Sequence, residues 1–413
     1  MLGKHRYAPL SATAKDSSDK VPRFTERDLT AFRHLRRFRE ALARAQQSVP
    51  VHDSFADPKR RMALGDYLCL FLMGLFNPVA RTLRGLVQAS DFPKLQRAVC
   101  TRSVSLGSFS EAQSLVDPAL LERVFVELAA QIPESPALPP ALRTRQWMAR
   151  DGSLFAALPR MTWALYGGGR EGFVNNAVRL NVSFHLLKDA PVAAKITVGK
   201  ACERAALREQ IKSGDAYVGD RYYGEHYALF AQLSRRGCRY LIRLIEKSVT
   251  TAVVEELPVS KEDEAAGVMR QAMVRLGSES TLSEVLRVIW FTGTGGQLIM
   301  LATNMSVEEL SAADATALYK HRWQIEYFFR WVKCLLGCGH WMAESPRGVA
   351  IQLYLALIGA LLLQLDLGRR PSKRVWELMQ WHQSGMIDDE TAARLLQRQL
   401  AAEEKKRAAK KPA

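Results

Sequence analysis

The chain has 413 residues, of which 48% are hydrophobic, so it can bury a sizeable core and should form two or three domains. Its 58 Lys and Arg against 42 Asp and Glu give a net charge of +16, which favours a polyanionic partner such as nucleic acid or an anionic membrane surface. The N-terminus lacks the apolar core of a signal peptide, and the apolar run 353–363 is too short to span a membrane. The six cysteines form no disulfide pattern. We therefore expect a cytoplasmic protein without a membrane segment.

The first 140 residues are predicted to be helical and basic. A helix over 25–47 carries Arg33, Arg36, Arg37, Arg39 and Arg44, and Thr25 and Asp28 can form a capping box. Further helices are expected at 60–76, 79–89, 108–116 (opened by Ser108) and 118–131 (opened by Asp117 and Pro118). The last two form either an ordinary packed pair or part of a DNA-binding module, and the proline-rich stretch 133–142 ends the region.

From Arg145 the hydrophobic pattern changes from a period of 3.6 to a period of 2, which predicts strands. The expected order is three strands, a helix, a strand, a helix and a strand, which is the order of a ribonuclease-H-like α/β domain. The predicted strands are 147–151, 177–187, 191–199, 216–220 and 239–244, and the helices are 201–213 and 224–236. The first part of this mixed-sheet core therefore covers 141–244.

Residues 245–305 are predicted to be a β-rich insertion. Four strand-like segments are separated by the acidic loop KEDEAA and by GTGG. These segments are 249–257, 268–276, 284–293 and 296–304. The core is expected to resume at 306–366, with a helix from about Ser306 or a second one from about Ser311, followed by a helical C-terminal region, 367–413, with a basic tail.

The segment YKHRWQIEYFFRWVK, 319–333, combines an apolar face with charged residues. At about 100° per residue, Tyr319, Arg322, Glu326 and Lys333 share one stripe about 60° wide. The apolar side chains fall on a different face, which can pack on a sheet; they are Ile325, Phe328, Phe329, Val332, Leu335 and Leu336. The simplest alternative is an ordinary surface ion pair between Arg322 and Glu326, with Lys333 solvated.

Two further acids stand at the predicted ends of strands. Asp151 ends the first strand and Asp220 the fourth, and these strands are neighbours in a ribonuclease-H-like sheet, so the two carboxylates can meet. Each also has a structural alternative, since Asp151-Gly152 is a good turn dipeptide and Asp220 can cap the next helix. With Glu326 added, three carboxylates suit two Mg²⁺ ions about 3.5–4 Å apart, which predicts phosphoryl transfer on nucleic acid.

The spacing Tyr-(2)-Arg-(3)-Glu-(6)-Lys at 319, 322, 326 and 333 resembles the YREK signature of DDE-type insertion-sequence transposases, the insertion sequence four family. MARDGS and YVGDRYYGEHYALFAQLSRRGCRYLIRL resemble the segments around that family's two catalytic aspartates, so the likeness covers about 140–365. It implies that Asp151, Asp220 and Glu326 hold Mg²⁺, replaceable by Mn²⁺, and that Tyr319, Arg322 and Lys333 bind phosphates at the transposon end. One departure is that Tyr222 and Tyr223 precede Gly224, where the family often has Gly soon after the aspartate and its arginine.

Three other residues are candidates for DNA binding. Members of the resembled family hold a flipped base on aromatic side chains in the better understood cases, and Trp290 and Trp323 could provide such a surface. Trp290 could equally be a strand core residue. Arg221 could reach a phosphate or pair with a nearby acid.

The resemblance implies a DNA transposase that binds terminal inverted repeats of double-stranded DNA, cuts them with Mg²⁺ and joins the ends to target DNA. Two alternatives remain: a metal-dependent nuclease without strand transfer, and a DNA-binding relative that has lost catalysis. Gathering three acids beside a polyanion argues against a purely binding role. Because two ends must be brought together, a homodimer on DNA is expected.

Overall fold

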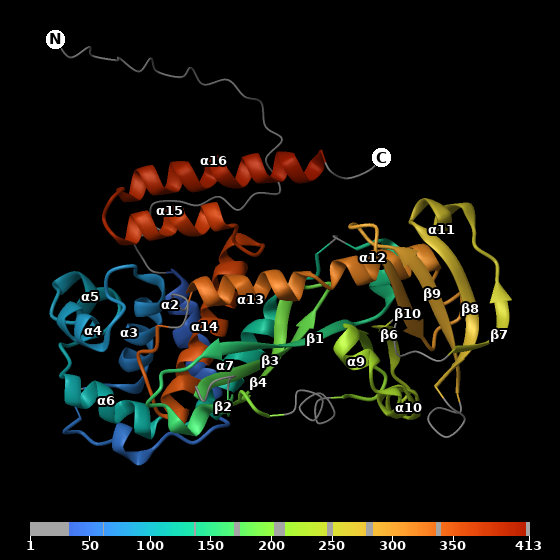
Figure 1. Ribbon diagram of the computed structural model, residues 1–413. Helices are drawn as coiled ribbons and strands as arrows, with labels where there is room; N and C mark the ends of the chain where they lie inside the picture. The colour runs from blue at the N-terminus through green and yellow to red at the C-terminus, as the bar shows by residue number, and fades with distance from the viewer. Residues whose placement is uncertain are drawn as a thin grey trace, which may run out of the picture.

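The computed structural model describes residues 33–409 except 61, 136–137, 169–173, 202–210, 246–250, 278–283 and 336–339. In this part of the chain one large mixed β-sheet runs through the molecule and helices pack against it (Figure 1). The N-terminal helices gather at one end of the sheet, and strands β7 to β10 form the other end (Figure 1).

The central strands have the order β4-β3-β1-β5-β6. Strands β1, β5 and β6 are parallel, whereas β3 is antiparallel to both β1 and β4. The bounds are β1 Trp147–Ala156, β2 Leu165–Gly168, β3 Val174–His185, β4 Ala190–Val198, β5 Ala216–Gly219 and β6 Arg239–Arg243. This confirms the predicted ribonuclease-H-like order; β2 was not predicted, and most of the helix expected at 201–213 lies outside the described residues.

Strand β1 is longer than predicted. The sequence pattern placed its end at Asp151, but β1 continues to Ala156 because its second half pairs with β3, from Asp151 opposite Val182 to Ala156 opposite Ala177. The Asp-Gly dipeptide therefore lies within a strand and forms no turn. Pairing with β5 ends earlier, at Ala149, so one side of β1 is free of β5 from Asp151 onward.

The predicted strands between 245 and 305 are present and extend the same sheet. Strand β10 pairs antiparallel with β6, and β9, β8 and β7 follow in that order. Their bounds are β7 Thr251–Leu257, β8 Val268–Leu276, β9 Val285–Thr292 and β10 Leu298–Thr303. The acidic segment expected to be a loop forms a short helix, α11 Lys261–Ala265, because Ser260 and Asp263 make a capping box.

The N-terminal helices have the predicted positions with some corrections. They are α2 Arg33–Ala45, α3 Leu64–Phe76, α4 Leu83–Ala89, α5 Pro93–Ala98, α6 Leu106–Leu115 and α7 Pro118–Gln131. Helix α6 is capped by Ser105 and not by Ser108, and α5 was not predicted. Asp117 caps α7 as expected, and the proposed cap at Thr25 lies outside the described residues.

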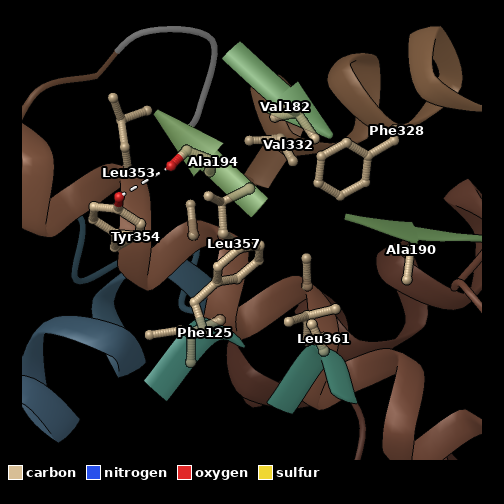
Figure 2. Packing of buried hydrophobic residues seen from close by; sticks show 14 of the residues in the cluster. Phe125, Val182, Ala190, Ala194, Phe328, Val332, Leu353, Tyr354, Leu357 and Leu361 are labelled. Atoms are coloured by element: carbon tan, nitrogen blue, oxygen red, sulfur yellow. Dashed lines mark hydrogen bonds between the residues drawn. The ribbon is translucent and has the colours of Figure 1, made fainter. Parts of the chain in front are cut away.

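Helix α14, Pro346–Leu367, joins the N-terminal helices to the sheet. Figure 2 shows Phe125 of α7 and Val182 and Ala194 of the sheet packed around Leu353, Leu357 and Leu361 of α14. The Tyr354 hydroxyl donates a hydrogen bond to the Ala194 carbonyl at 3.3 Å (Figure 2). Among the described helices only α14 is long and apolar enough to cross a membrane, and 89% of that apolar window is buried inside the protein. The region before residue 140 thus shares one hydrophobic core with the sheet, and the division into functional domains remains a prediction.

The two faces of the sheet have separate cores. Ala149, Val218 and Phe291 belong to the core that contains α12 Ala312–His321, α13 Gln324–Leu335 and α14. The opposite face packs against α9 Arg221–Gly224 and α10 Tyr227–Arg235. Helices α15 Lys373–Gln383 and α16 Asp389–Ala408 form a hairpin with its own small core, and α16 includes most of the predicted basic tail.

Candidate active site

Asp151 and Asp220 lie at the same level of neighbouring parallel strands. The last register pair between β1 and β5 is Ala149 with Val218, and each aspartate stands two residues further along its strand direction. Because side chains alternate along a strand, each aspartate points to the same face as Ala149 and Val218, which is the face covered by α13. The prediction that the two strands are neighbours is confirmed.

Asp220 also caps the next helix. Its Oδ1 accepts a hydrogen bond from the Tyr222 amide at 3.0 Å. The expectation that Asp220 can cap the following helix is therefore confirmed. A Cβ on Gly224, at the end of this one-turn helix, would lie 2.0 Å from the Arg243 carbonyl oxygen of β6. The close approach of α9 to β6 therefore accounts for glycine at 224. Asp151 Oδ1 accepts from the Gly152 amide at 2.8 Å.

The segment 319–333 is not one continuous helix. Helix α12 begins after its cap Ser311 and ends at His321, a turn at Arg322 and Trp323 follows, and α13 begins at Gln324. A uniform 100° per residue therefore does not hold across residues 322 and 323. The apolar face is confirmed for Ile325, Phe328, Phe329, Val332 and Leu335, while Leu336 lies outside the described residues.

Arg322 is the centre of the charged group. Its Nη2 lies 2.9 Å from Glu326 Oε1, and the exposed fractions of the two side chains are 4% and 30%. The pair predicted for the surface is therefore present, but its cation is buried. Burial by itself lowers the pKa of Arg322, yet Tyr319, Glu326 and Asp220 together raise it above its ordinary value. Arg322 is thus paired directly with Glu326 of α13.

The contact of Lys333 with Phe155 shows how α13 lies over β1. The Lys333 Nζ lies 5.3 Å from the centre of the Phe155 ring, and α13 runs along β1 in the same direction (Figure 1). Glu326 precedes Lys333 by seven helical residues, about 10 Å, whereas Asp151 precedes Phe155 by four strand residues, about 13 Å. This direction brings the start of α13 toward the level of Asp151. Within the described residues, no group of three His, Cys, Asp or Glu side chains lies close enough to hold a metal ion.

The remaining candidates are distributed differently. Tyr319 is buried in α12 and meets Phe291 edge to face at 6.3 Å, and its ring also lies 5.5 Å from the Arg322 guanidinium. Trp323 is 46% exposed, and the centre of its ring also lies 5.5 Å from the Arg322 guanidinium. Arg221 is exposed at the start of α9.

Trp290 is not brought to this face of the sheet. It lies in the core on the opposite face, is 9% exposed, and is covered by the Arg270 guanidinium at 4.7 Å. Trp290 therefore lies where a core residue of a strand would lie, as the alternative reading of the sequence expected. A role of Trp290 in DNA binding stays a prediction.

One residue near the site was not foreseen from the sequence. Arg370, just after α14, donates from Nη1 to the Gln324 carbonyl at 3.0 Å, at the first residue of α13. No local pattern could have revealed this contact, because Arg370 and Gln324 lie on different elements far apart in the chain.

Comparison with known proteins agrees with this geometry. Residues 151–363 match the family described as transposase DDE domain. The chain is 28% identical over 206 residues to a Sinorhizobium fredii protein that carries the name transposase y4zB. This alignment covers 49% of this chain and 56% of that protein. It is 25% identical over 207 residues to a Geobacillus stearothermophilus protein named for the transposase of insertion sequence element IS5377, covering 50% and 52%. The chain thus spans about half the length of the curated relatives it matches.

A solved structure, the piggyBac transposase synaptic complex with hairpin DNA, aligns over 94% of this chain and 82% of its own. The TM-score is 0.42 and the sequence identity 8%, so the fold assignment rests on the strand order.

Proposed function

Because the chain belongs to the transposase DDE domain family, we propose that it is a DNA transposase of an insertion sequence, which binds terminal inverted repeats, cuts DNA and joins the ends to target DNA. The observation that supports this most directly is that Asp151 and Asp220 follow the same register pair on two neighbouring parallel strands, on the sheet face that α13 covers. The spacing of Tyr319, Arg322, Glu326 and Lys333 further supports membership of the insertion sequence four family.

Asp151, Asp220 and Glu326 are the proposed ligands of two Mg²⁺ ions, for which Mn²⁺ can substitute. Carboxylate oxygens are the ligands that a hard cation prefers, and bound ions would activate the attacking oxygen and stabilise the leaving one. In the described structure the three side chains do not lie close enough together to hold an ion, so we expect Glu326 to approach the two aspartates when metal binds. Glu326 is paired with Arg322 at 2.9 Å, so cation binding has to compete with this ion pair. We therefore expect Arg322 to exchange one partner for another when metal and DNA bind.

Arg322 has the donors that a phosphate needs. Its Nε and Nη1 are buried and have no hydrogen-bond partner among the described residues. Such donors, held next to the proposed metal ligands, can orient the scissile phosphate. Lys333 and Tyr319 are proposed to hold neighbouring phosphates, with Arg221, Trp323 and Trp290 as further DNA contacts.

The proposed partner is double-stranded DNA, at the element's ends and at the target, bound by a homodimer in the cytoplasm. A plasmid bearing the element's own inverted repeats, incubated with the protein and Mg²⁺, should be cut at the ends and give joined products. Asp151→Ala, Asp220→Ala and Glu326→Ala should each abolish cutting and retain end binding. Glu255→Gln, which changes an exposed carboxylate on β7, is the matched control and should remain active.

The DNA products of this assay distinguish a transposase from the two alternative functions. Cutting without joined products would identify a nuclease, and end binding without cutting by the unaltered protein would identify a DNA-binding relative that has lost catalysis. Full activity of any of the three alanine variants would show that the site is assigned wrongly.

A further inference from the structure

The first residue of α13, Gln324, is held by a second arginine, Arg370. Arg370 donates from Nη1 to the Gln324 carbonyl at 3.0 Å and from Nη2 to the Gln324 side-chain oxygen. The same Nη2 lies 3.3 Å from Asp189 Oδ1, and the exposed fractions of the two side chains are 14% and 25%. One planar guanidinium thus joins the first residue of α13 to the turn between β3 and β4.

The turn between β3 and β4 is fixed by its own backbone conformation and by hydrogen bonds from α14. Asp189 is the only non-glycine residue with a positive φ in the described part of the chain, at 49°, a conformation that aspartate tolerates better than most residues. Gln364 of α14 donates to the carbonyls of Lys188 at 3.0 Å and Asp189 at 3.3 Å. The turn is therefore a fixed support for the α12–α13 junction.

Helix capping does not account for Arg370. The N-terminus of a helix carries a partial positive charge, so a cation beside it is electrostatically unfavourable. The helix dipole therefore does not stabilise Arg370 at the start of α13. Its burial also has an electrostatic cost, because burial lowers the pKa of Arg370 below its ordinary value even though Asp189 acts to raise it. A role in fixing geometry explains a buried arginine here better than helix stabilisation.

We propose that Arg370 is a positioning residue for Glu326, which sets the start of α13 against the β3–β4 turn and so fixes the distance of the Glu326 carboxylate from Asp151 and Asp220. This inference rests on the proposed role of Glu326 as a metal ligand. Glu326 stands two residues after Gln324, so a shift of Gln324 moves Glu326 with it. A misplacement of about 1 Å can lower a rate by about 100-fold.

The test uses Arg370→Lys, with Arg369→Lys as its matched control. A lysine side chain in place of Arg370 would keep the positive charge for Asp189 but cannot bond both Gln324 oxygens from a planar fork. Arg369 is the neighbouring residue, its side chain is 13% exposed, and it pairs with Glu403 and Glu404 of α16 instead of α13. Asp189→Asn tolerates the same backbone conformation and removes only the charge.

Two measurements on the full chain test whether Arg370 positions Glu326. Hydrogen exchange of the amides over 324–328 should become at least about 10-fold faster in Arg370→Lys and stay unchanged in Arg369→Lys. The single-turnover rate of end cleavage should fall about 10- to 100-fold in Arg370→Lys, with unchanged affinity for end DNA. Asp189→Asn should have an intermediate effect on both quantities.

Unchanged exchange and cleavage in Arg370→Lys, or equal losses in Arg369→Lys, would overturn the proposal. If the unaltered protein cuts no DNA, the proposed function fails, and the exchange measurement alone still decides whether Arg370 holds the start of α13.

Discussion

Asp151 and Asp220 stand side by side on parallel strands, each two residues beyond the pair of Ala149 and Val218. Strand β5 ends at Gly219 while β1 continues to Ala156, so the two aspartates stand where the sheet loses one strand. The carboxyl ends of parallel strands are the usual place for ligands in open α/β sheets.

Metal binding should be measurable as stabilisation. If Asp151 and Asp220 hold cations, adding Mg²⁺ or Mn²⁺ should raise the melting temperature, by the equivalent of about 2.7 kcal/mol at 100 times the dissociation constant. Asp151→Asn and Asp220→Asn should lose this increase, whereas Glu255→Gln should retain it. Differential scanning fluorimetry at increasing metal concentration measures the effect, and the same increase in all four proteins would argue against the site.

Lys333 should contribute to the salt dependence of DNA binding. Each phosphate contact releases about one counterion, so Lys333→Ala should make the plot of log affinity against log salt shallower by about 1. Lys373→Ala, at a side chain that is 90% exposed on α15, is the control and should leave the slope unchanged. Fluorescence anisotropy with end DNA at several salt concentrations gives both slopes, and identical slopes for Lys333→Ala and the parent would contradict the phosphate role.

Gly224→Ala should destabilise the protein and impair catalysis together. The added Cβ would lie 2.0 Å from the Arg243 carbonyl oxygen, so α9 must move, and Asp220 at its N-terminus moves with it. A loss of about 2–4 kcal/mol in the free energy of unfolding is expected from such a backbone clash. Gly107→Ala, in α6 where the nearest neighbouring atom to the new Cβ is 4.0 Å away, should instead stabilise by about 0.5–1 kcal/mol. Urea unfolding of both variants checks the contrast.

Stability should fall in mild acid because of two histidines. Burial lowers the pKa of His34 and of His185 to about 4, from an ordinary value of 6.5. Between these values the unfolded chain binds more protons than the folded one, so stability is complete above pH 6.5 and declines as the pH falls toward 4. Each histidine adds a slope of up to about 1.4 kcal/mol per pH unit. Urea unfolding from about pH 7 to about pH 4.5 measures the slope, and His185→Gln should reduce it; an unchanged slope would count against the neutral state of His185.

The order of strands along the chain was predictable because it depends on local alternation of apolar and polar residues, whereas the roles assigned to the charged residues stay predictions. Strands β3 to β6 and the four inserted strands were identified in this way. The end of β1 was not, since the turn preference of Asp151-Gly152 is outweighed by pairing with β3, which is distant in sequence. The attachment of β10 to β6 is equally nonlocal.

The junction at Arg322 and Trp323 shows the same limit within the site. Neither residue is a glycine or proline, so the sequence of the segment indicates one helix. Two arginines make contacts next to this turn: Arg322 is buried and pairs with Glu326, and Arg370, from beyond α14, is 14% exposed and bonds to Gln324. Tertiary contacts of this kind are not contained in single-sequence patterns.

The pairing of β6 with β10 also has a consequence for synthesis of the chain. β6 is complete at Arg243, but the strand that pairs with its outer edge, β10, comes much later in the chain, at Leu298–Thr303. At about 5–20 residues per second, the nascent protein therefore exposes an open, apolar strand edge for several seconds on the ribosome. Open edges of this kind invite pairing with other chains, so this interval of synthesis is the one in which aggregation through β6 is favoured.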